Sequence, residues 1–226
     1  MLEIQNLTKS FEQPGGGRLV ILDIPSLSLA AGEQAVLIGQ SGGGKTTLLH
    51  LIAGLLTPDS GTIRVAGTDI TRLSESGRDR FRASTTGYVF QTFNLLAGFT
   101  ALENVRLGMS FASGRHDSAR ALALLDRVGL ADRAHYRPAQ LSVGQQLRVA
   151  IARSLASRPK LLLADEPTAN VDPASSQTVI DLIRDSCRED DVALLLVTHS
   201  MELAAQFDRV ERLEQLNRVL AGAAAV

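Results

Sequence analysis

The chain has 226 residues, of which 45% are hydrophobic and 21% charged, and its 23 Lys and Arg against 24 Asp and Glu give a net charge of -1. These proportions are typical of a folded globular protein and exclude an intrinsically disordered chain. The balanced charge lacks the basic excess that drives binding to nucleic-acid phosphates, so we expect no nucleic-acid partner.

The amino-terminal part of the chain is predicted to form antiparallel strands. Residues 14–17, Pro-Gly-Gly-Gly, are typical of a turn between two extended segments. Further along, Ile63 and Val65 alternate with less apolar neighbours between two glycines. This period of two is the pattern of a strand that buries one face and exposes the other.

Short, continuously apolar runs predict strands that are covered on both faces. They occupy residues 35–38, 161–164 and 192–197. Strands of a parallel sheet have this composition because helices cover both sides of the sheet. Apolar residues at helical spacing occupy residues 48–56, 119–128, 143–155 and 179–183. Alternating strands and helices indicate an α/β fold with a mainly parallel sheet and a smaller antiparallel part.

Mainly helical patterns fill the middle of the chain. We therefore expect a single domain over residues 1–226, in which residues 1–91 and 158–226 form the α/β core with the antiparallel part, and residues 92–157 form a helical insertion. Pro159 ends the last of these helices, and a buried strand follows directly. The two parts are thus expected to interleave along the chain.

A glycine-rich segment predicts a phosphate-binding loop (P-loop). Its residues match the pattern G-x-x-x-x-G-K-[ST] between a predicted strand and a predicted helix: Gly39, Gln40, Ser41, Gly42, Gly43, Gly44, Lys45 and Thr46. Glycines permit backbone conformations in which successive N–H groups converge on phosphate oxygens at a helix N-terminus. Lys45 is expected to reach the β and γ phosphates and Thr46 to bind Mg²⁺, while Thr47 belongs to the same nucleotide site.

Two acidic residues follow the buried strand at residues 161–164. Asp165 and Glu166 lie at the strand end where open α/β sheets place their ligands. Asp165 is predicted to hold Mg²⁺, directly or through water, and Glu166 to orient or deprotonate the attacking water. Such a pair also occurs in solvated loops, but the phosphate loop favours the metal site. The residues alone predict a protein that binds a nucleoside triphosphate with Mg²⁺ and cleaves it.

Residues 141–153, Leu-Ser-Val-Gly-Gln-Gln-Leu-Arg-Val-Ala-Ile-Ala-Arg, resemble the signature segment of ABC ATPases. Nearly the whole chain follows the order of motifs in that family. The resemblance implies ATP as the nucleotide and four further site residues: Phe11 as the aromatic that stacks on adenine, Gln91 as the lid glutamine at the metal, Asp172 in the D-loop, and His199 as the switch histidine at the γ-phosphate.

The resemblance also assigns a role to the start of the signature helix. Its residues Ser142, Val143, Gly144 and Gln145 are implied to contact the γ-phosphate bound to a second copy of the chain, so that two ATP molecules lie between two subunits. Ser142 suits this role because it can cap the helix that starts at Val143 and direct its N–H groups outward. Val143 replaces the usual glycine of the signature and Leu147 a usual glutamine, so we expect altered closure.

Residues 88–96 and 100–105 resemble, within ABC proteins, the lipoprotein-release, macrolide-export and cell-division ATPases. This implies the ATP-binding and ATP-hydrolysing subunit of a transporter that acts with two separate membrane-spanning permease subunits. Its implied task is export or extraction of a lipid-linked or amphiphilic substrate. A mechanical signalling ATPase that controls a cell-wall enzyme through a membrane partner, without transport, stays open as the alternative. A DNA-repair ATPase is disfavoured because the chain has no room for long coiled coils between loop and signature.

The expected location is the cytoplasmic face of the cell membrane, with attachment through the permease. The longest apolar runs fall far short of the roughly 20 residues that a membrane helix needs. Cys187 is the single cysteine, so no internal disulfide can form, and the first residues lack a signal-peptide pattern.

Overall fold

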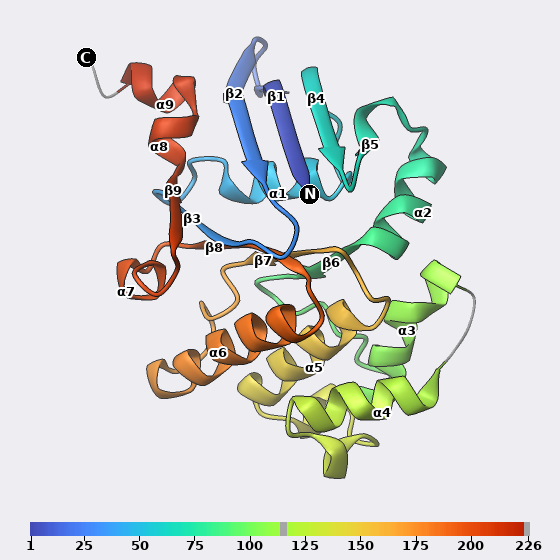
Figure 1. The fold of residues 1–226 in the computed structure, drawn as a ribbon. Helices are drawn as coiled ribbons and strands as arrows, with labels where there is room; N and C mark the ends of the chain where they lie inside the picture. The colour runs from blue at the N-terminus through green and yellow to red at the C-terminus, as the bar shows by residue number, and fades with distance from the viewer. Residues whose placement is uncertain (114–116, 224–226) are drawn as a thin grey trace.

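The computed structural model describes residues 1–113 and 117–223, which form two sheets and a layer of helices (Figure 1). The strands are β1 (Leu2–Glu12), β2 (Arg18–Leu29), β3 (Gln34–Ile38), β4 (Ser60–Val65), β5 (Thr68–Asp69), β6 (Thr86–Val89), β7 (Leu161–Asp165), β8 (Ala193–Thr198) and β9 (Arg209–Arg212). The helices are α1 (Lys45–Ile52), α2 (Glu75–Thr85), α3 (Ala101–Ser113), α4 (Ser118–Arg127), α5 (Val143–Leu155), α6 (Pro173–Glu189), α7 (Met201–Ala204), α8 (Leu213–Leu216) and α9 (Arg218–Ala223). Short 3-10 helices lie at Ile70–Arg72, Ala131–Arg133 and Pro138–Gln140.

The larger sheet has the strand order β6-β7-β8-β3-β9, and every pair in it is parallel. Its strands alternate between two hydrophobic clusters because successive side chains point to opposite faces. In β7, Leu161 and Leu163 pack toward α1 and the smaller sheet, whereas Leu162 and Ala164 pack toward the helical layer. Both faces are buried, which confirms the predicted parallel sheet and α/β fold.

The smaller sheet is antiparallel, with the order β2-β1-β4-β5. A turn within residues 13–17 connects β1 to β2, as predicted. Ile63 and Val65 of β4 are fully buried while Arg64 between them is exposed, which confirms the half-buried strand. Figure 1 shows α1 between the two sheets, so this helix contributes to the core that they share.

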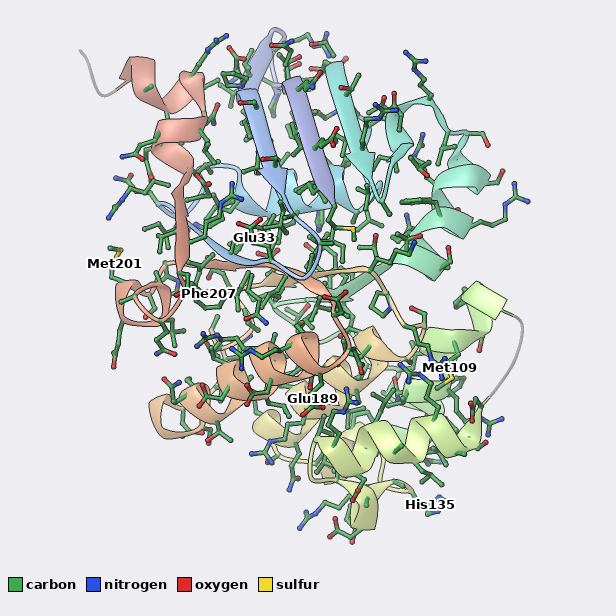
Figure 2. The ribbon with its side chains drawn as sticks, in the orientation of Figure 1. Glu33, Met109, His135, Glu189, Met201 and Phe207 are labelled. Carbon is green, nitrogen blue, oxygen red and sulfur yellow. The ribbon has the colours of Figure 1, made fainter. Side chains whose placement is uncertain are left out.

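Between β6 and β7, the described residues form α3, α4, α5 and two 3-10 helices. Together with α6 they cover the other face of the parallel sheet (Figure 1). Figure 2 shows His135 at the outer end of this layer, away from both sheets. Among the described residues, no helix has the length and apolar composition needed to cross a membrane.

The predicted bounds of the helix after the phosphate loop were wrong at both ends. The apolar run suggested residues 48–56, but α1 spans Lys45–Ile52. The helix starts earlier because the polar residues Lys45, Thr46 and Thr47 form its first turn. It ends earlier because Gly54 adopts a φ of 67°, a left-handed conformation that terminates helices. The lysine of the loop therefore belongs to the helix.

The last two described helices lie at the edge of the smaller sheet. Figure 1 shows α8 and α9 beside β2. Asn217, which is fully buried between these helices, accepts a hydrogen bond from Asp23 N and donates one from Nδ2 to Ile21 O, both at 2.8 Å. These bonds satisfy two backbone groups of β2 at the sheet edge. The sequence patterns did not predict α8 or α9.

Candidate nucleotide and catalytic site

The phosphate loop connects β3 to α1 and requires glycine at two positions. Gly42 and Gly44 have φ angles of 78° and 101°, which residues with a side chain rarely adopt. A Cβ on Gly44 would also lie 2.9 Å from Leu22 Cδ2 and 3.0 Å from Ile21 Cγ2. This backbone course brings the loop to the N-terminus of α1, whose first N–H groups have no acceptor within the helix. Such an arrangement suits a phosphate group.

Lys45 lies at the centre of the loop with 5% of its surface exposed. Its Nζ donates hydrogen bonds to Gly39 O and Gln40 O, both at 2.9 Å. The same nitrogen lies 3.6 Å from Glu166 Oε1. Two carbonyls and a carboxylate therefore hold the nearly buried Lys45 ammonium beside the loop. Its side chain is already ordered in the position from which it can bind an anion.

Asp165 ends β7 and lies under the start of α1. It is 5% exposed, and the Tyr88 hydroxyl lies 3.4 Å from its Oδ2 as a hydrogen-bond donor. Burial raises the pKa of Asp165, a hydrogen bond with Thr46 opposes this, and the nearby Glu166 charge raises it further. The carboxylate and the Thr46 hydroxyl are hard oxygen donors of the kind that Mg²⁺ prefers, so these two residues fit a magnesium ion.

Replacing Asp165 by Asn is expected to stabilise the nucleotide-free protein while it abolishes Mg²⁺-dependent hydrolysis. Burial disfavours the charged form of the Asp165 carboxyl and raises its pKa, and an amide of the same shape avoids that cost. We expect the melting temperature of the empty protein to rise by about 2–4 °C, the shift that ~1 kcal/mol produces at this size. The melting temperature is measured from the circular dichroism signal during thermal unfolding.

The sign of the pH dependence provides the control. Because the pKa of Asp165 is raised in the folded state, its protonated form favours folding at low pH, and that contribution is lost as pH rises through the raised pKa. The melting temperature of Asp165→Asn should therefore exceed that of the unmodified protein most near neutral pH, and this difference should shrink as the pH falls. A variant that is less stable than the parent at neutral pH contradicts this account.

Glu166 and His199 meet beside Lys45. Glu166 has a φ of 43°, and its N–H donates to Val197 O at 3.0 Å. This left-handed turn at the end of β7 places Oε2 at 3.1 Å from Nδ1 of His199, which follows the adjacent strand β8. The His199 side chain is 66% exposed, so the pair is accessible to solvent. The structure thus brings together the predicted water-orienting acid and the predicted histidine.

A cavity of about 330 Å³ joins most of the predicted nucleotide residues. Its lining consists of Phe11, Ile21, Ser41, Gly42, Gly44, Lys45, Thr46, Thr47, Gln91 and Glu166. Of these, Ile21 alone was not predicted from the sequence. Phe11 reaches it from β1 and is 40% exposed, and Lys9 Nζ lies 5.3 Å from the centroid of its ring. His199 lies in a neighbouring cavity of about 310 Å³ that also contains Glu166.

The segment that follows Gln91 is held from two distant parts of the chain. Asn170 Nδ2 donates to Gln91 O at 3.0 Å. Arg153, near the end of α5, donates to Phe93 O and Asn94 O, both at 2.6 Å. Phe93 and Asn94 adopt left-handed φ angles of 59° and 49°, which turn both carbonyls toward this guanidinium. The sequence places Asn170 in the segment that resembles the D-loop and Arg153 at the end of the signature segment, but it predicts neither contact, since neither has a local signal.

The signature residues lie at the exposed N-terminus of α5. Ser142 Oγ accepts from Gln145 N at 3.3 Å, and Gln145 Oε1 accepts from Ser142 N at 2.9 Å. This reciprocal capping box leaves Val143 47% exposed, and nothing lies within 4 Å of a Cβ built on Gly144. None of the residues at 142–145 lines the nucleotide cavity of the same chain. Leu147, the other unusual residue of the signature, is fully buried in the core.

The remaining predicted residues have contacts outside the cavity. Asp172 caps α6, accepting from Ser175 N at 2.9 Å through its side chain. Gly39 and Gly43 face Leu213. Gln40 N–H donates to Glu214 Oε1 at 2.9 Å. The loop therefore has one side toward the cavity and another toward the end of the chain.

The loop after β3, the nearly buried lysine and the carboxylates at the end of β7 in the same parallel sheet place this chain among the phosphate-loop nucleoside triphosphatases. The family model described as ABC transporter matches residues 22–169, and the chain belongs to that family. It is an ATP-hydrolysing enzyme with the ABC ATPase fold.

Individual relatives agree with this assignment. A lipoprotein-releasing system ATP-binding protein, LolD 2, from Caulobacter vibrioides is 45% identical, over 95% of this chain and 94% of that protein. The lipoprotein-releasing system ATP-binding protein LolD of Cereibacter sphaeroides is 46% identical, over 95% of this chain and 96% of that protein. A solved dimeric ATP-binding cassette, MJ0796 in a post-hydrolysis state with ADP and Pi, superposes with a TM-score of 0.86 at 33% identity, covering 94% of each chain. The predicted family and subgroup are confirmed.

Proposed function

We propose that this chain powers an ABC transporter that extracts or exports a lipid-linked or amphiphilic substrate from the membrane. It acts as an ATP-sandwich dimer at the cytoplasmic face, beneath two separate membrane-spanning permease subunits. The observation that carries the proposal is the division of the site. Lys45, Gln91 and Glu166 line one cavity, whereas the capped end of α5 is exposed elsewhere on the surface. The similarity to proteins named for lipoprotein release supports the substrate class.

Within one subunit, the loop residues 39–47 bind the phosphates through backbone N–H groups, and Lys45 binds the β and γ phosphates. Phe11 stacks on the adenine. Thr46, Asp165 and Gln91 hold Mg²⁺, which when bound neutralises the charge that develops on the phosphate oxygens. Glu166 orients and deprotonates the attacking water, and His199 positions the Glu166 carboxylate and contacts the γ-phosphate.

The other half of each site comes from a second copy of the chain. Ser142, Val143, Gly144 and Gln145 contact the γ-phosphate of the partner's nucleotide through the N-terminal N–H groups of α5. Asp172 lies at the same interface. Solved cassettes 33% and 34% identical to this chain are dimeric, which supports the arrangement. ATP joins the halves because both contact its charge, and hydrolysis removes the contact that favoured closure.

Residues 92–157 transmit this closure as one helical unit. The Arg153 guanidinium links α5, whose first residue follows Ser142, to the segment after Gln91. Arg153 and Asn94 also line a groove of about 500 Å³ between α2, β6 and α3. Phe111, 74% exposed, and Leu55 give this groove an apolar wall. A permease segment docked there touches the same residues that respond to the nucleotide.

Reconstitution tests the proposal. The tagged chain is co-expressed with the membrane proteins of neighbouring reading frames and placed in liposomes with a triacylated lipopeptide. We expect co-purification of the membrane subunits, stimulation of ATP hydrolysis by the lipopeptide, and its ATP-dependent release to an acceptor. Phe111→Asp should lose the membrane subunits, whereas Leu122→Asp, an equally drastic change of an exposed residue on α4, should retain them.

The outcomes separate transport from signalling. A complex that hydrolyses ATP and rearranges its extracytoplasmic part, yet neither responds to the lipopeptide nor releases it, contradicts transport and supports a mechanical signalling ATPase. Failure of Phe111→Asp to affect co-purification contradicts the groove as the permease contact.

A further inference from the structure

The end of the chain supports the phosphate loop from the side opposite to the nucleotide. Leu213 of α8 is fully buried. A Cβ on Gly39 would lie 3.1 Å from Leu213 Cβ, and one on Gly43 would lie 3.6 Å from both Leu213 Cδ2 and Leu220 Cδ1. The loop therefore packs directly on α8 and α9.

These helices are fixed to the strand that supports the other end of the loop. Asn217, buried between α8 and α9, binds Ile21 O and Asp23 N of β2. Ile21 lines the nucleotide cavity and lies against Gly44, the residue directly before α1. Figure 1 shows α8 and α9 in place beside β2. The loop thus packs on the C-terminal helices at Gly39 and Gly43, and on β2, to which Asn217 is hydrogen-bonded, at Gly44.

The peptide group between Gly39 and Gln40 is held at both of its polar atoms. Its carbonyl oxygen accepts from Lys45 Nζ at 2.9 Å, and its N–H donates to Glu214 Oε1 at 2.9 Å. A peptide group is planar, so fixing the N–H direction also fixes the direction of the carbonyl. Glu214 thereby sets the orientation of an oxygen that positions the lysine. A charged acceptor makes this hydrogen bond stronger than a neutral one.

We propose that Glu214 is a positioning residue for ATP binding: its carboxylate holds the first peptide group of the phosphate loop so that Lys45 is pre-organised for the triphosphate. This inference rests on the proposed role of residues 39–47. Gln40 does not line the nucleotide cavity, so Glu214 acts through the loop and not by touching the nucleotide. A negative charge near the triphosphate weakens its binding, so the benefit of Glu214 comes from geometry.

Three substitutions distinguish geometry from charge. Glu214→Ala removes the acceptor, Glu214→Gln keeps an acceptor oxygen without the charge, and Glu214→Lys removes the acceptor while adding a positive charge. Gln215→Ala, a change of the exposed neighbour on α8, is the matched control. Binding of a fluorescent ATP analogue is measured together with KM and kcat, and circular dichroism checks the fold.

We expect Glu214→Ala and Glu214→Lys to raise Kd and KM about tenfold with kcat within about twofold, as for loss of one hydrogen bond to a charged acceptor. Glu214→Gln should raise Kd and KM less than Glu214→Ala does, with kcat within about twofold, because it can retain the hydrogen bond without the charge that strengthens it. Gln215→Ala should leave all three quantities unchanged. Unaltered affinity in Glu214→Ala, tighter binding in Glu214→Lys, or a loss confined to kcat overturns the proposal.

The variant Lys45→Ala, measured in the same assay, distinguishes an error in the role of Glu214 from an error in the proposed phosphate site. If Lys45→Ala abolishes binding of the analogue while Glu214→Ala does not weaken it, the role of Glu214 is wrong and the phosphate site stands. If Lys45→Ala binds the analogue as tightly as the parent, the phosphate site itself is misplaced and the role of Glu214 is refuted with it.

Discussion

Replacement of Glu166 by Gln is expected to stop ATP hydrolysis and to trap two copies of the chain around two ATP molecules. The amide has the shape of the carboxylate and can still bond to His199 Nδ1, now 3.1 Å from Glu166 Oε2. It cannot take a proton from the attacking water, so hydrolysis should fall by about 10²–10⁴, the usual contribution of a general base. Loss of a negative charge beside the phosphates favours the closed, ATP-bound state.

Size-exclusion chromatography with ATP and Mg²⁺ measures the trapped dimer, and phosphate release measures the rate. With ADP in place of ATP the variant should elute as a monomer. Glu189→Gln, the same change at an exposed position at the end of α6, should leave the rate and the elution unchanged. If Glu166→Gln with ATP and Mg²⁺ elutes only as a monomer, the sandwich model loses its main support.

Replacement of Lys45 by Ala should abolish ATP binding. The variant lacks the cation for the β and γ phosphates, and it leaves Gly39 O and Gln40 O without the donor that now bonds to both at 2.9 Å. A charged group that is preorganised in a site of low exposure contributes several kcal/mol, so we expect at least about a hundredfold loss of affinity and of hydrolysis. Equilibrium binding of a fluorescent ATP analogue measures the loss.

Lys160→Ala, at an exposed position before β7, is the control and should bind the analogue like the parent. Because Lys45 is nearly buried, its replacement could also destabilise the fold. Thermal unfolding of both variants shows whether the loss of binding comes with a loss of stability. An unchanged hydrolysis rate in Lys45→Ala would dismiss this placement of the phosphate site.

Elements with strong local patterns were predicted well. The strands at residues 35–38, 161–164 and 192–197 and the helix at 143–155 agree with β3, β7, β8 and α5 to within one or two residues. Their signals are continuous apolar runs or clear periodicity. By contrast, α2 is highly charged and α8 has four residues, so neither has an apolar period that a reader of the sequence could detect. They are stabilised by tertiary contacts, since Phe81 of α2 packs partly buried on the core and Leu213 of α8 is fully buried.

By itself, the sequence determined the parts of this protein whose chemistry lies within a few consecutive residues. The phosphate loop, the two acids at the end of β7 and the capped start of α5 are encoded by local spacing. The end of a strand or helix fixes the direction in which the neighbouring residues point. Only the tertiary structure decided which distant groups meet. Arg153 reaches the carbonyls of Phe93 and Asn94, Asn170 reaches Gln91, and Glu214 reaches an amide 174 residues away. Such contacts depend on how the sheets and the helical layer pack together, and no periodic pattern in the sequence predicts that packing.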